Sequence, residues 1–385
     1  MGLAGEIVVR LACDATGVRR ATIASTRPDA VSRVLAGRAA DDAVALVPRL
    51  FAVCAQGQGA AASEAVAAAC GRPRNPTQRA RELAVALEGV QEDLWRLVVD
   101  WPPLIGLAPD VGALAHARRS TTPLIDALSA HASGEHDREA PTRDAETAAS
   151  ETLHAIAATR VFGESSGTFL ARQDEQALRA WAKDRATPAA LLARALFAMA
   201  PGLGASDVDA LKLDRATVQR SVLPALDRDA SFARLPEIDG EPRETGALER
   251  IGAHAGLAAL AARDGSGACT RLFARLVQLA ASLEALRDEG CLAAIDAWSP
   301  RAGEGVAMLR TARGTLVHRA RVANGAIASY AIVAPTEWTF HPRGALARGL
   351  ARLRGDSPAS LLRDASMLVR LADACVPCTV ELADA

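Results

Sequence analysis

The stretch Asp373-Ala374-Cys375-Val376-Pro377-Cys378-Thr379-Val380-Glu381, close to the carboxyl end, carries two cysteines at a Cys-x-x-Cys spacing. Two thiols at that spacing can reach one metal ion or form one disulfide. A third, isolated cysteine, Cys54, follows Arg49-Leu50-Phe51-Ala52-Val53 near the other end of the chain. Two thiol sites at opposite ends of a chain can build a buried metal centre when folding brings them together. These two segments therefore give the strongest indication of both fold and chemistry.

The residues alone leave several explanations open for these thiols. Thiolate sulfur is a soft ligand that suits iron, zinc and copper(I). Cys375 and Cys378 can equally be a thiol pair without metal. A redox disulfide is disfavoured, because the motif does not open a helix after a strand. A structural zinc site usually needs four ligands, and the sequence has no second Cys-x-x-Cys and no paired histidines. Taken alone, Cys54 is most simply a small buried hydrophobic residue.

Composition excludes several classes of protein. The chain has 385 residues, half of them apolar, and a formal net charge of -1. That length allows a large core, and the near-zero charge argues against a general nucleic-acid binder. The odd number of cysteines, seven, does not suggest a disulfide framework, and we expect a reducing cytoplasm. The remaining four have no partner pattern and are expected in the core: Cys13, Cys70, Cys269 and Cys291.

No targeting or membrane segment is expected. The first ten residues lack a basic region followed by a long apolar run, as a secretory signal would have. No stretch offers the roughly 18–20 apolar residues that a membrane helix needs.

The residue pattern predicts a mixture of helices and hairpins. Alternating, β-branched runs at 6–12 and 18–25 predict an amino-terminal hairpin. A late hairpin is predicted over 315–322 and 326–333, because Asn324-Gly325 suits a turn whose central residues both need positive φ. Apolar residues at helical spacing predict helices over 43–47, 78–99, 111–130, 151–161, 175–181, 189–199, about 269–298 and 361–371. Residues 131–150 are almost all small, charged or polar, which predicts an exposed, mobile insertion rather than a domain boundary.

The chain resembles the large subunit of nickel-iron hydrogenases along nearly its whole length. That family carries Arg-x-Cys-Gly-x-Cys-x-x-x-His near its start and Asp-Pro-Cys-x-x-Cys-x-x-His at its end. Its intermediate motifs are Glu-x-Gly-Pro-Leu-x-Arg, Ala-Pro-Arg-Gly and Pro-Thr-Thr-Trp. The matching segments occur here in the same order: Gly37-Arg38, Arg49 to Cys54 with Gln58, Glu244-Thr245-Gly246-Ala247-Leu248-Glu249-Arg250, Ala312-Arg313-Gly314, Pro335-Thr336-Glu337-Trp338, and Asp373 to Cys378 with Glu381.

This resemblance implies a ligand set from which one member is missing. In the family, four cysteines hold the metals: the second of each pair bridges nickel and iron, and the first binds nickel alone. Cys54 and Cys378 match the two bridging positions, and Cys375 matches one nickel-only position. The other nickel-only position is Phe51, which has no donor atom. The resemblance therefore implies an iron side that is intact and no bound nickel.

The family's iron carries two cyanides and one carbon monoxide. Cyanide is anionic and accepts hydrogen bonds, and the matching donors here are the Arg313 guanidinium and the Thr336 hydroxyl. Asp373 is expected to orient the cysteine loop or pair with Arg313. The simpler alternatives are a turn cap for Thr336 and a surface carboxylate at a helix end for Asp373.

Other departures point to a relative that is not itself a hydrogenase. The family's proton-carrying glutamate corresponds to Ala4, and Glu381 replaces its terminal histidine. Catalytic precursors carry a longer tail that a nickel-dependent protease removes, and we expect no such tail after Ala385. These departures match the HupK/HoxV-type hydrogenase maturation proteins, as does Glu92-Asp93-Leu94-Trp95-Arg96-Leu97 followed by Asp100-Trp101-Pro102.

The resemblance implies one large-subunit-like domain over residues 1–385. We expect a mostly helical α+β fold, with terminal β-hairpins around a helical core and both cysteine sites at its centre. The implied function is a non-catalytic scaffold that takes the iron–dicyanide–carbonyl unit, Fe(CN)2CO, from a Hyp-type maturation complex and passes it to the hydrogenase large subunit. The alternatives are a divergent hydrogenase, against which Phe51 argues, and an assembly chaperone that binds no metal.

Overall fold

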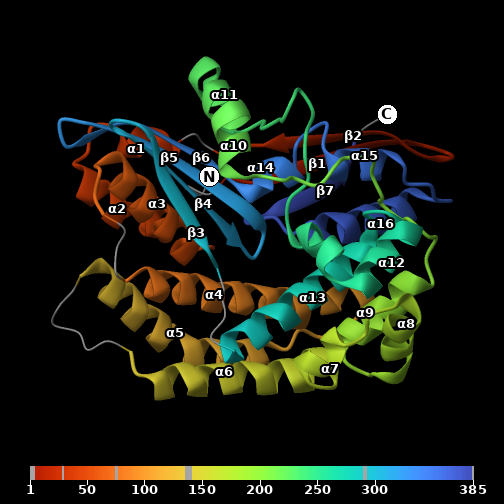
Figure 1. Ribbon diagram of the computed structural model, residues 1–385. Coiled ribbons are helices and arrows are strands. Elements are labelled where there is room, and N and C mark those ends of the chain that lie inside the picture. The colour runs from red at the N-terminus through yellow and green to blue at the C-terminus, as the bar shows by residue number, and fades with distance from the viewer. Residues whose placement is uncertain (1–4, 28–29, 74–76, 135–140, 289–292, 384–385) are drawn as a thin grey trace.

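Two β-sheets and a large set of helices make up the fold of the computed structural model, which describes residues 5–27, 30–73, 77–134, 141–288 and 293–383 (Figure 1). The strands are β1 Ile7–Asp14, β2 Gly17–Ser25, β3 Ile295–Arg301, β4 Glu304–Thr311, β5 Gly314–Ala323, β6 Ala326–Val333 and β7 Cys378–Leu382. The α-helices are α1 Ala30–Leu35, α2 Ala40–Leu46, α3 Ala55–Ala69, α4 Gln78–Trp95, α5 Val111–Ser133, α6 Arg143–Ala157, α7 Ser166–Leu170, α8 Glu175–Asp184, α9 Pro188–Phe197, α10 Arg215–Thr217, α11 Leu223–Arg228, α12 Ala255–Asp264, α13 Ala268–Arg287, α14 Pro335–Thr339, α15 Ala345–Ala351 and α16 Pro358–Leu371.

The first sheet joins the two ends of the described chain. Strands β1 and β2 form the predicted antiparallel hairpin, and β7 adds to the other edge of β1 in parallel. Cys378 lies opposite Ile7 in this register. The sequence analysis did not predict β7, and its pairing with β1 anchors the second cysteine segment to the amino-terminal strand.

The second sheet is antiparallel, in the order β3-β4-β5-β6. The predicted Asn324-Gly325 hairpin is confirmed: both residues have positive φ, 51° and 76°, between β5 and β6. The prediction of one helical region over 269–298 is wrong beyond α13, because residues 295–301 form β3 and pair with β4. The apolar pattern of a short segment fits a helix and a buried strand equally well. Here the pairing with β4 decides in favour of the strand.

The helices form a layered arrangement beside the sheets. In Figure 1, α4 runs beneath the four-stranded sheet, and α5 and α6 follow on the far side of α4. The prediction for 78–99 is confirmed by α4, which continues as a π-helical turn over Arg96–Asp100. Among the described residues, no helix is long and apolar enough to cross a membrane.

The predicted polar insertion at 131–150 is largely helical where the structure describes it. Helix α5 extends to Ser133 and α6 starts at Arg143, where Thr142 caps it by accepting a hydrogen bond from the amide of Ala145. Ala149 and Ser150 are buried. Most of the described residues from 142 to 148 are exposed, and the mobility predicted for this segment stays a prediction. Residues 135–140 lie outside the described ranges, and the single-domain organisation stays a prediction.

Helix α3 packs very closely against the four-stranded sheet, and its small residues allow this. Ala61, Ala62 and Ala65 are fully buried in a cluster shared with β4 and β5. A β-carbon on Gly305 of β4 would overlap the carbonyl oxygen of Ala65 and the amide nitrogen of Ala69. The position of α3, and therefore of the cysteine before it, depends on this contact between backbones.

We expect Gly305→Ala to destabilise the protein by about 1–3 kcal/mol, because the helix must move away from the sheet. Gly89→Ala is the control: a β-carbon there meets no atom within 4 Å, and alanine favours the interior of α4. Thermal unfolding midpoints should fall for Gly305→Ala and stay level or rise for Gly89→Ala. Equal midpoints for the two variants would contradict the close packing.

Candidate metal centre

Arg313 joins the two cysteine segments. It lies in the turn between β4 and β5, and its side chain is 3% exposed. Its Nη1 donates to the sulfur of Cys54 at 3.1 Å, and its Nη2 donates to Glu92 Oε2 at 2.8 Å. Its Nε lies 3.2 Å from Asp373 Oδ1. Three residues predicted for the site, Cys54, Arg313 and Asp373, are therefore brought together by this guanidinium.

Cys54 is held in a restricted conformation at the start of α3. Its φ is 61°, in the left-handed region that non-glycine residues seldom adopt. Two amides of the first helical turn, those of Gln56 and Gly57, donate to the partly buried carboxylate of Glu88 at 2.9 and 3.0 Å. Burial raises the pKa of the Cys54 thiol strongly, and the charge of Arg313 opposes this only in part. Metal binding at Cys54 must therefore displace a proton.

Cys375 is paired with Thr336. The Thr336 hydroxyl donates to the Cys375 sulfur at 3.1 Å and accepts from the Cys375 amide at 3.4 Å. Thr336 lies in the first turn of α14, directly after Pro335, and is buried. Its hydroxyl is therefore directed at the cysteine segment as well as being placed near a helix start.

Cys378 is the first residue of β7 and has a different environment. Its thiol donates to the carbonyl of Val376 at 3.5 Å, and burial raises its pKa to about 12. Within the part of the chain that the structure describes, no three or more histidine, cysteine, aspartate or glutamate side chains are close enough together to hold a metal ion. The three site cysteines therefore do not form one gathered ligand set, although Cys54 and Cys375 each have a hydrogen-bond donor at their sulfur.

Asp373 is the charged centre that holds this region together. It is buried, its φ is 58°, and its carboxylate contacts the guanidinium groups of Arg96, Arg275 and Arg313. Burial alone would raise the pKa of Asp373, but Arg313, Arg96 and Arg275 lower it below the ordinary aspartate value. Asp373 therefore stays ionised and pairs with Arg313, and its expected role in orienting the cysteine loop stays a prediction.

The sequence analysis missed two of these arginines. Arg96 lies in the π-helical turn after α4, and its guanidinium contacts Asp373, the carbonyl of Ala374 and, at 2.8 Å, Asp100. Its segment was recognised only as a resemblance. Arg275 lies in the middle of the largely apolar helix α13. A buried arginine in such a helix requires an anionic partner, and that was the available signal.

A second layer of polar contacts fixes the loop that carries Arg313. Arg275 Nη1 donates to Asp93 Oδ1 at 2.5 Å and to the carbonyl of Ala312 at 2.7 Å. Gln278 Nε2 donates to the same carbonyl at 2.9 Å and to Asp93. Helices α4 and α13 thereby hold the backbone directly before Arg313.

The Glu244–Arg250 segment supports the same loop from another side. Glu244 is buried and paired with Arg271 of α13. The Thr245 hydroxyl accepts from the amide of Thr315 at 2.9 Å, one residue past Gly314. This motif therefore acts through the backbone of the β4–β5 turn.

The structure shows what surrounds two positions that depart from the hydrogenase pattern, Phe51 and Gln58. Phe51 is partly buried and packs against the apolar cluster of α3 and the four-stranded sheet. The oxygen of Gln58 accepts from His318 Nε2 at 2.8 Å, while Tyr330 donates its hydroxyl to His318 Nδ1 at 2.7 Å. Burial lowers the pKa of His318 to about 3, so this group is neutral. Ala4 lies outside the described residues.

The other cysteines are free thiols where they are described. Cys269 is buried, Cys13 and Cys70 are partly buried, and Cys291 lies outside the described ranges.

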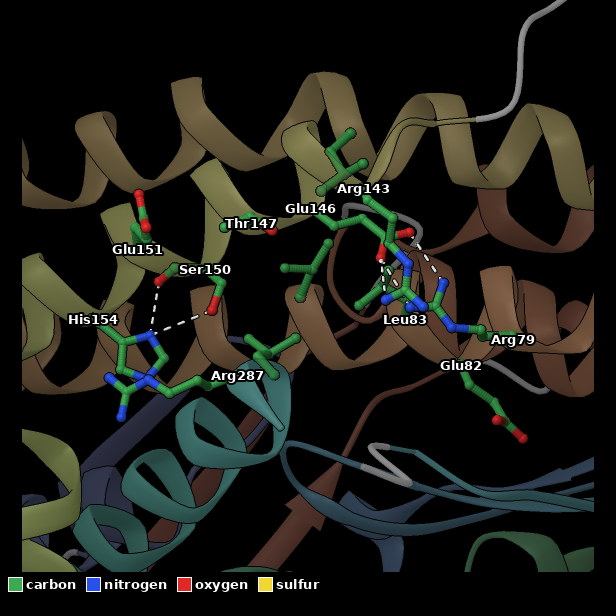
Figure 2. Close-up of a pocket in the computed structure, with 13 residues that line it drawn as sticks. Arg79, Glu82, Leu83, Arg143, Glu146, Thr147, Ser150, Glu151, His154 and Arg287 are labelled. Atoms are coloured by element: carbon green, nitrogen blue, oxygen red, sulfur yellow. Dashed lines mark hydrogen bonds and ion pairs between the residues drawn. The ribbon is translucent and has the colours of Figure 1, made fainter. Parts of the chain in front are cut away.

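A cavity of about 630 Å³ lies between α4, α5, α6 and the end of α13, and contains no residue predicted for the site. Figure 2 shows the paired side chains along it: Arg79 contacts Glu146 at 2.9 and 3.0 Å, and the His154 ring contacts Ser150. The cavity is separate from the cysteine site.

Comparison with known proteins gives full-length matches. The chain is 32% identical over 378 residues to the hydrogenase expression/formation protein HoxV of Cupriavidus necator, covering 94% of this chain and 93% of HoxV. It is 31% identical to the hydrogenase expression/formation protein HupK of Azotobacter vinelandii, covering all of both chains. The chain belongs to the HoxV/HupK family of hydrogenase expression/formation proteins. A family model described as nickel-dependent hydrogenase matches residues 257–349.

The fold of this HoxV/HupK-family chain is that of nickel-iron-selenium hydrogenase structures. It aligns with the reduced enzyme of Desulfomicrobium baculatum at a TM-score of 0.61 and 16% identity, covering 96% of this chain and 95% of that chain. For the Desulfovibrio vulgaris Hildenborough enzyme in the reduced state the TM-score is 0.58 at 17% identity. These matches confirm the predicted mostly helical α+β fold.

We expect Asp373→Asn to destabilise the protein by about 3–5 kcal/mol, because it leaves buried guanidinium groups without their shared carboxylate. Asparagine tolerates the positive φ, so the change isolates the charge. The control is Asp207→Asn, an exposed aspartate that pairs with Arg348 and Arg352 and should matter little. Denaturant unfolding of both variants against the unaltered protein tests this. Equal stability would mean that Asp373 does not organise the site.

Proposed function

We propose that this chain is a non-catalytic maturation factor that transiently carries the Fe(CN)2CO unit before its transfer to the catalytic large subunit. Membership of a family of hydrogenase expression/formation proteins supports the maturation role. One observation supports the cargo: Arg313 and Thr336 each donate a hydrogen bond to the sulfur of a different cysteine segment. Both donors therefore face the space where a metal bound by these thiolates would sit.

The residues present fit such a cargo chemically. Cyanide is anionic and accepts hydrogen bonds, and a charge-assisted bond contributes about 1.5–3 kcal/mol. Arg313 offers a buried guanidinium, and its Nε has no hydrogen-bond partner although Asp373 lies close by. Soft thiolate ligands from Cys54, Cys375 and Cys378 suit iron.

The arrangement also suits a cargo that must leave. Phe51 offers no nickel ligand, so no second metal closes the site. The described thiols do not form a gathered set of three, and full coordination would require Cys378 to change its contacts. The protein thus orients and shields the cargo through Arg313, Thr336 and the arginines that contact Asp373. The three cysteines do not all coordinate the metal at once. We infer that a Hyp-type maturation complex supplies the cargo and that the hydrogenase large subunit accepts it.

A second candidate is an assembly chaperone that binds no metal. The separated thiols favour it, because a resident site would be expected to have its ligands gathered. A divergent hydrogenase is the weaker alternative, because Phe51 removes a nickel ligand. Infrared spectra and metal analysis of the anaerobically purified protein distinguish these functions.

We expect the protein from hydrogenase-producing cells to have cyanide and carbonyl stretching bands and to contain iron. Cys378→Ser and Cys54→Ser should each lose most of the iron, and Cys375→Ser should lose as much or less. The control is Cys269→Ser, a buried free thiol on α13 outside the site. Iron content and infrared bands of each variant measure the effect.

Unchanged iron in Cys378→Ser would remove that residue from the ligand set. A protein without bands or iron in every preparation would favour the metal-free chaperone.

We expect no stoichiometric nickel and no hydrogen uptake, because position 51 holds phenylalanine where nickel needs a thiolate. Nickel and iron are measured on the same sample, from a strain in which every other hydrogenase is deleted. Phe51→Cys should admit nickel only weakly. Hydrogen uptake by the unaltered protein in that strain would support a divergent enzyme instead.

A further inference from the structure

A second arginine, Arg27, lies near the cysteine site and comes from the first sheet rather than from the β4–β5 turn. Arg27 follows β2, and its Nη1 donates to Glu337 Oε1 at 2.6 Å. Glu337 is the neighbour of Thr336 in α14, whose hydroxyl donates to the Cys375 sulfur. The Arg27–Glu337 pair therefore lies beside Cys375, while Arg313 reaches Cys54 from the other sheet.

The two arginines differ in burial. The side chains of Arg27 and Glu337 are 15% and 13% exposed, whereas those of Arg313 and Asp373 are 3% and 4% exposed. Arg27 thus forms the outer, solvent-reachable edge of the site, and Arg313 forms its inner wall.

Their electrostatic surroundings are similar. Burial lowers the pKa of Arg27, but the proximity of Cys375, Glu337 and Cys54 raises it by more. The pKa of Arg313 is likewise raised by Asp373, Cys54, Glu92 and Cys375 against the effect of burial. Both thiol positions therefore lie within the field of two guanidinium groups.

Arg27 also contacts fewer carboxylates than Arg313 does among the described residues. Arg313 is already shared between Glu92 and Asp373, both buried. Among the described residues, Arg27 contacts one carboxylate, that of Glu337, in a partly exposed pair. A guanidinium that is largely buried needs an anionic partner, and an anionic ligand of the cargo can take the place of Glu337 without leaving Arg27 unpaired.

We propose that Arg27 is a second anion-binding residue of the cargo site, and that Glu337 competes with the cargo for its guanidinium. In the loaded protein Arg27 binds an anionic ligand of the iron unit, and Glu337 recaptures Arg27 when the cargo leaves. This inference rests on the proposed function and adds a residue that the resemblance did not suggest. No covalent step is involved.

The test compares Arg27→Gln, Arg27→Lys and Glu337→Gln with the unaltered protein, each purified anaerobically from hydrogenase-producing cells. Arg27→Gln should lose iron to a chelator about tenfold faster, as expected for one charge-assisted hydrogen bond. Its cyanide stretching bands should also shift. Arg27→Lys keeps the positive charge, and its rate of iron loss should lie between those of Arg27→Gln and the unaltered protein. Glu337→Gln should lose iron more slowly, because it frees Arg27 for the cargo.

The matched control is Arg172→Gln, which breaks a comparably buried pair with Glu164 away from the cysteines. Thermal unfolding midpoints show whether any variant has lost its fold. Loaded protein whose bands and iron loss are unchanged in Arg27→Gln and Glu337→Gln overturns this inference alone. Unaltered protein that never carries cyanide-bearing iron overturns the proposed function and this inference together.

Discussion

A buried carboxylate surrounded by three guanidinium groups holds the cysteine site in place. Asp373 contacts Arg96, Arg275 and Arg313, and each arginine comes from a different part of the chain. Burying several charges is costly unless each finds its partner, and removing one partner costs more than the pair contributes. The π-helical turn after α4, the middle of α13 and the β4–β5 turn are therefore positioned relative to one carboxylate.

That dependence explains how a site assembled from both ends of the chain can be rigid. Cys54 is fixed by the packing of α3 on the four-stranded sheet and by Arg313. Cys375 is fixed by Thr336, and Cys378 by the pairing of β7 with β1. The outer edge, with Arg27 and Glu337, is less buried than the centre. A deeply buried inner wall beside a less buried edge is consistent with the proposed role of shielding a cargo and then releasing it.

Several elements followed directly from local sequence. The Asn324-Gly325 turn needs only two residues with positive φ, and α4 follows from its apolar spacing. The elements missed or misjudged were β3, β4 and β7. Strand β7 depends on pairing with the distant strand β1, and β3 and β4 pair with each other and with β5, a pairing that their local pattern did not indicate. Within 131–150 the structure shows helical residues that the polar composition did not indicate, and the mobility of this segment stays a prediction.

The sequence by itself determined the family resemblance, the cysteine positions and the phenylalanine at position 51, because residue type and order are properties of the chain. It also indicated Arg313, Thr336 and Asp373 as partners of the cysteine segments. Only the tertiary structure decided which charges meet: Arg96 and Arg275 at Asp373, Glu92 at Arg313, and Glu337 at Arg27. The two residues of each pair are between 98 and 310 positions apart in the sequence. The sequence gives which side chains are charged. Which buried charges pair with one another depends on the fold, because folding removes both partners from water together.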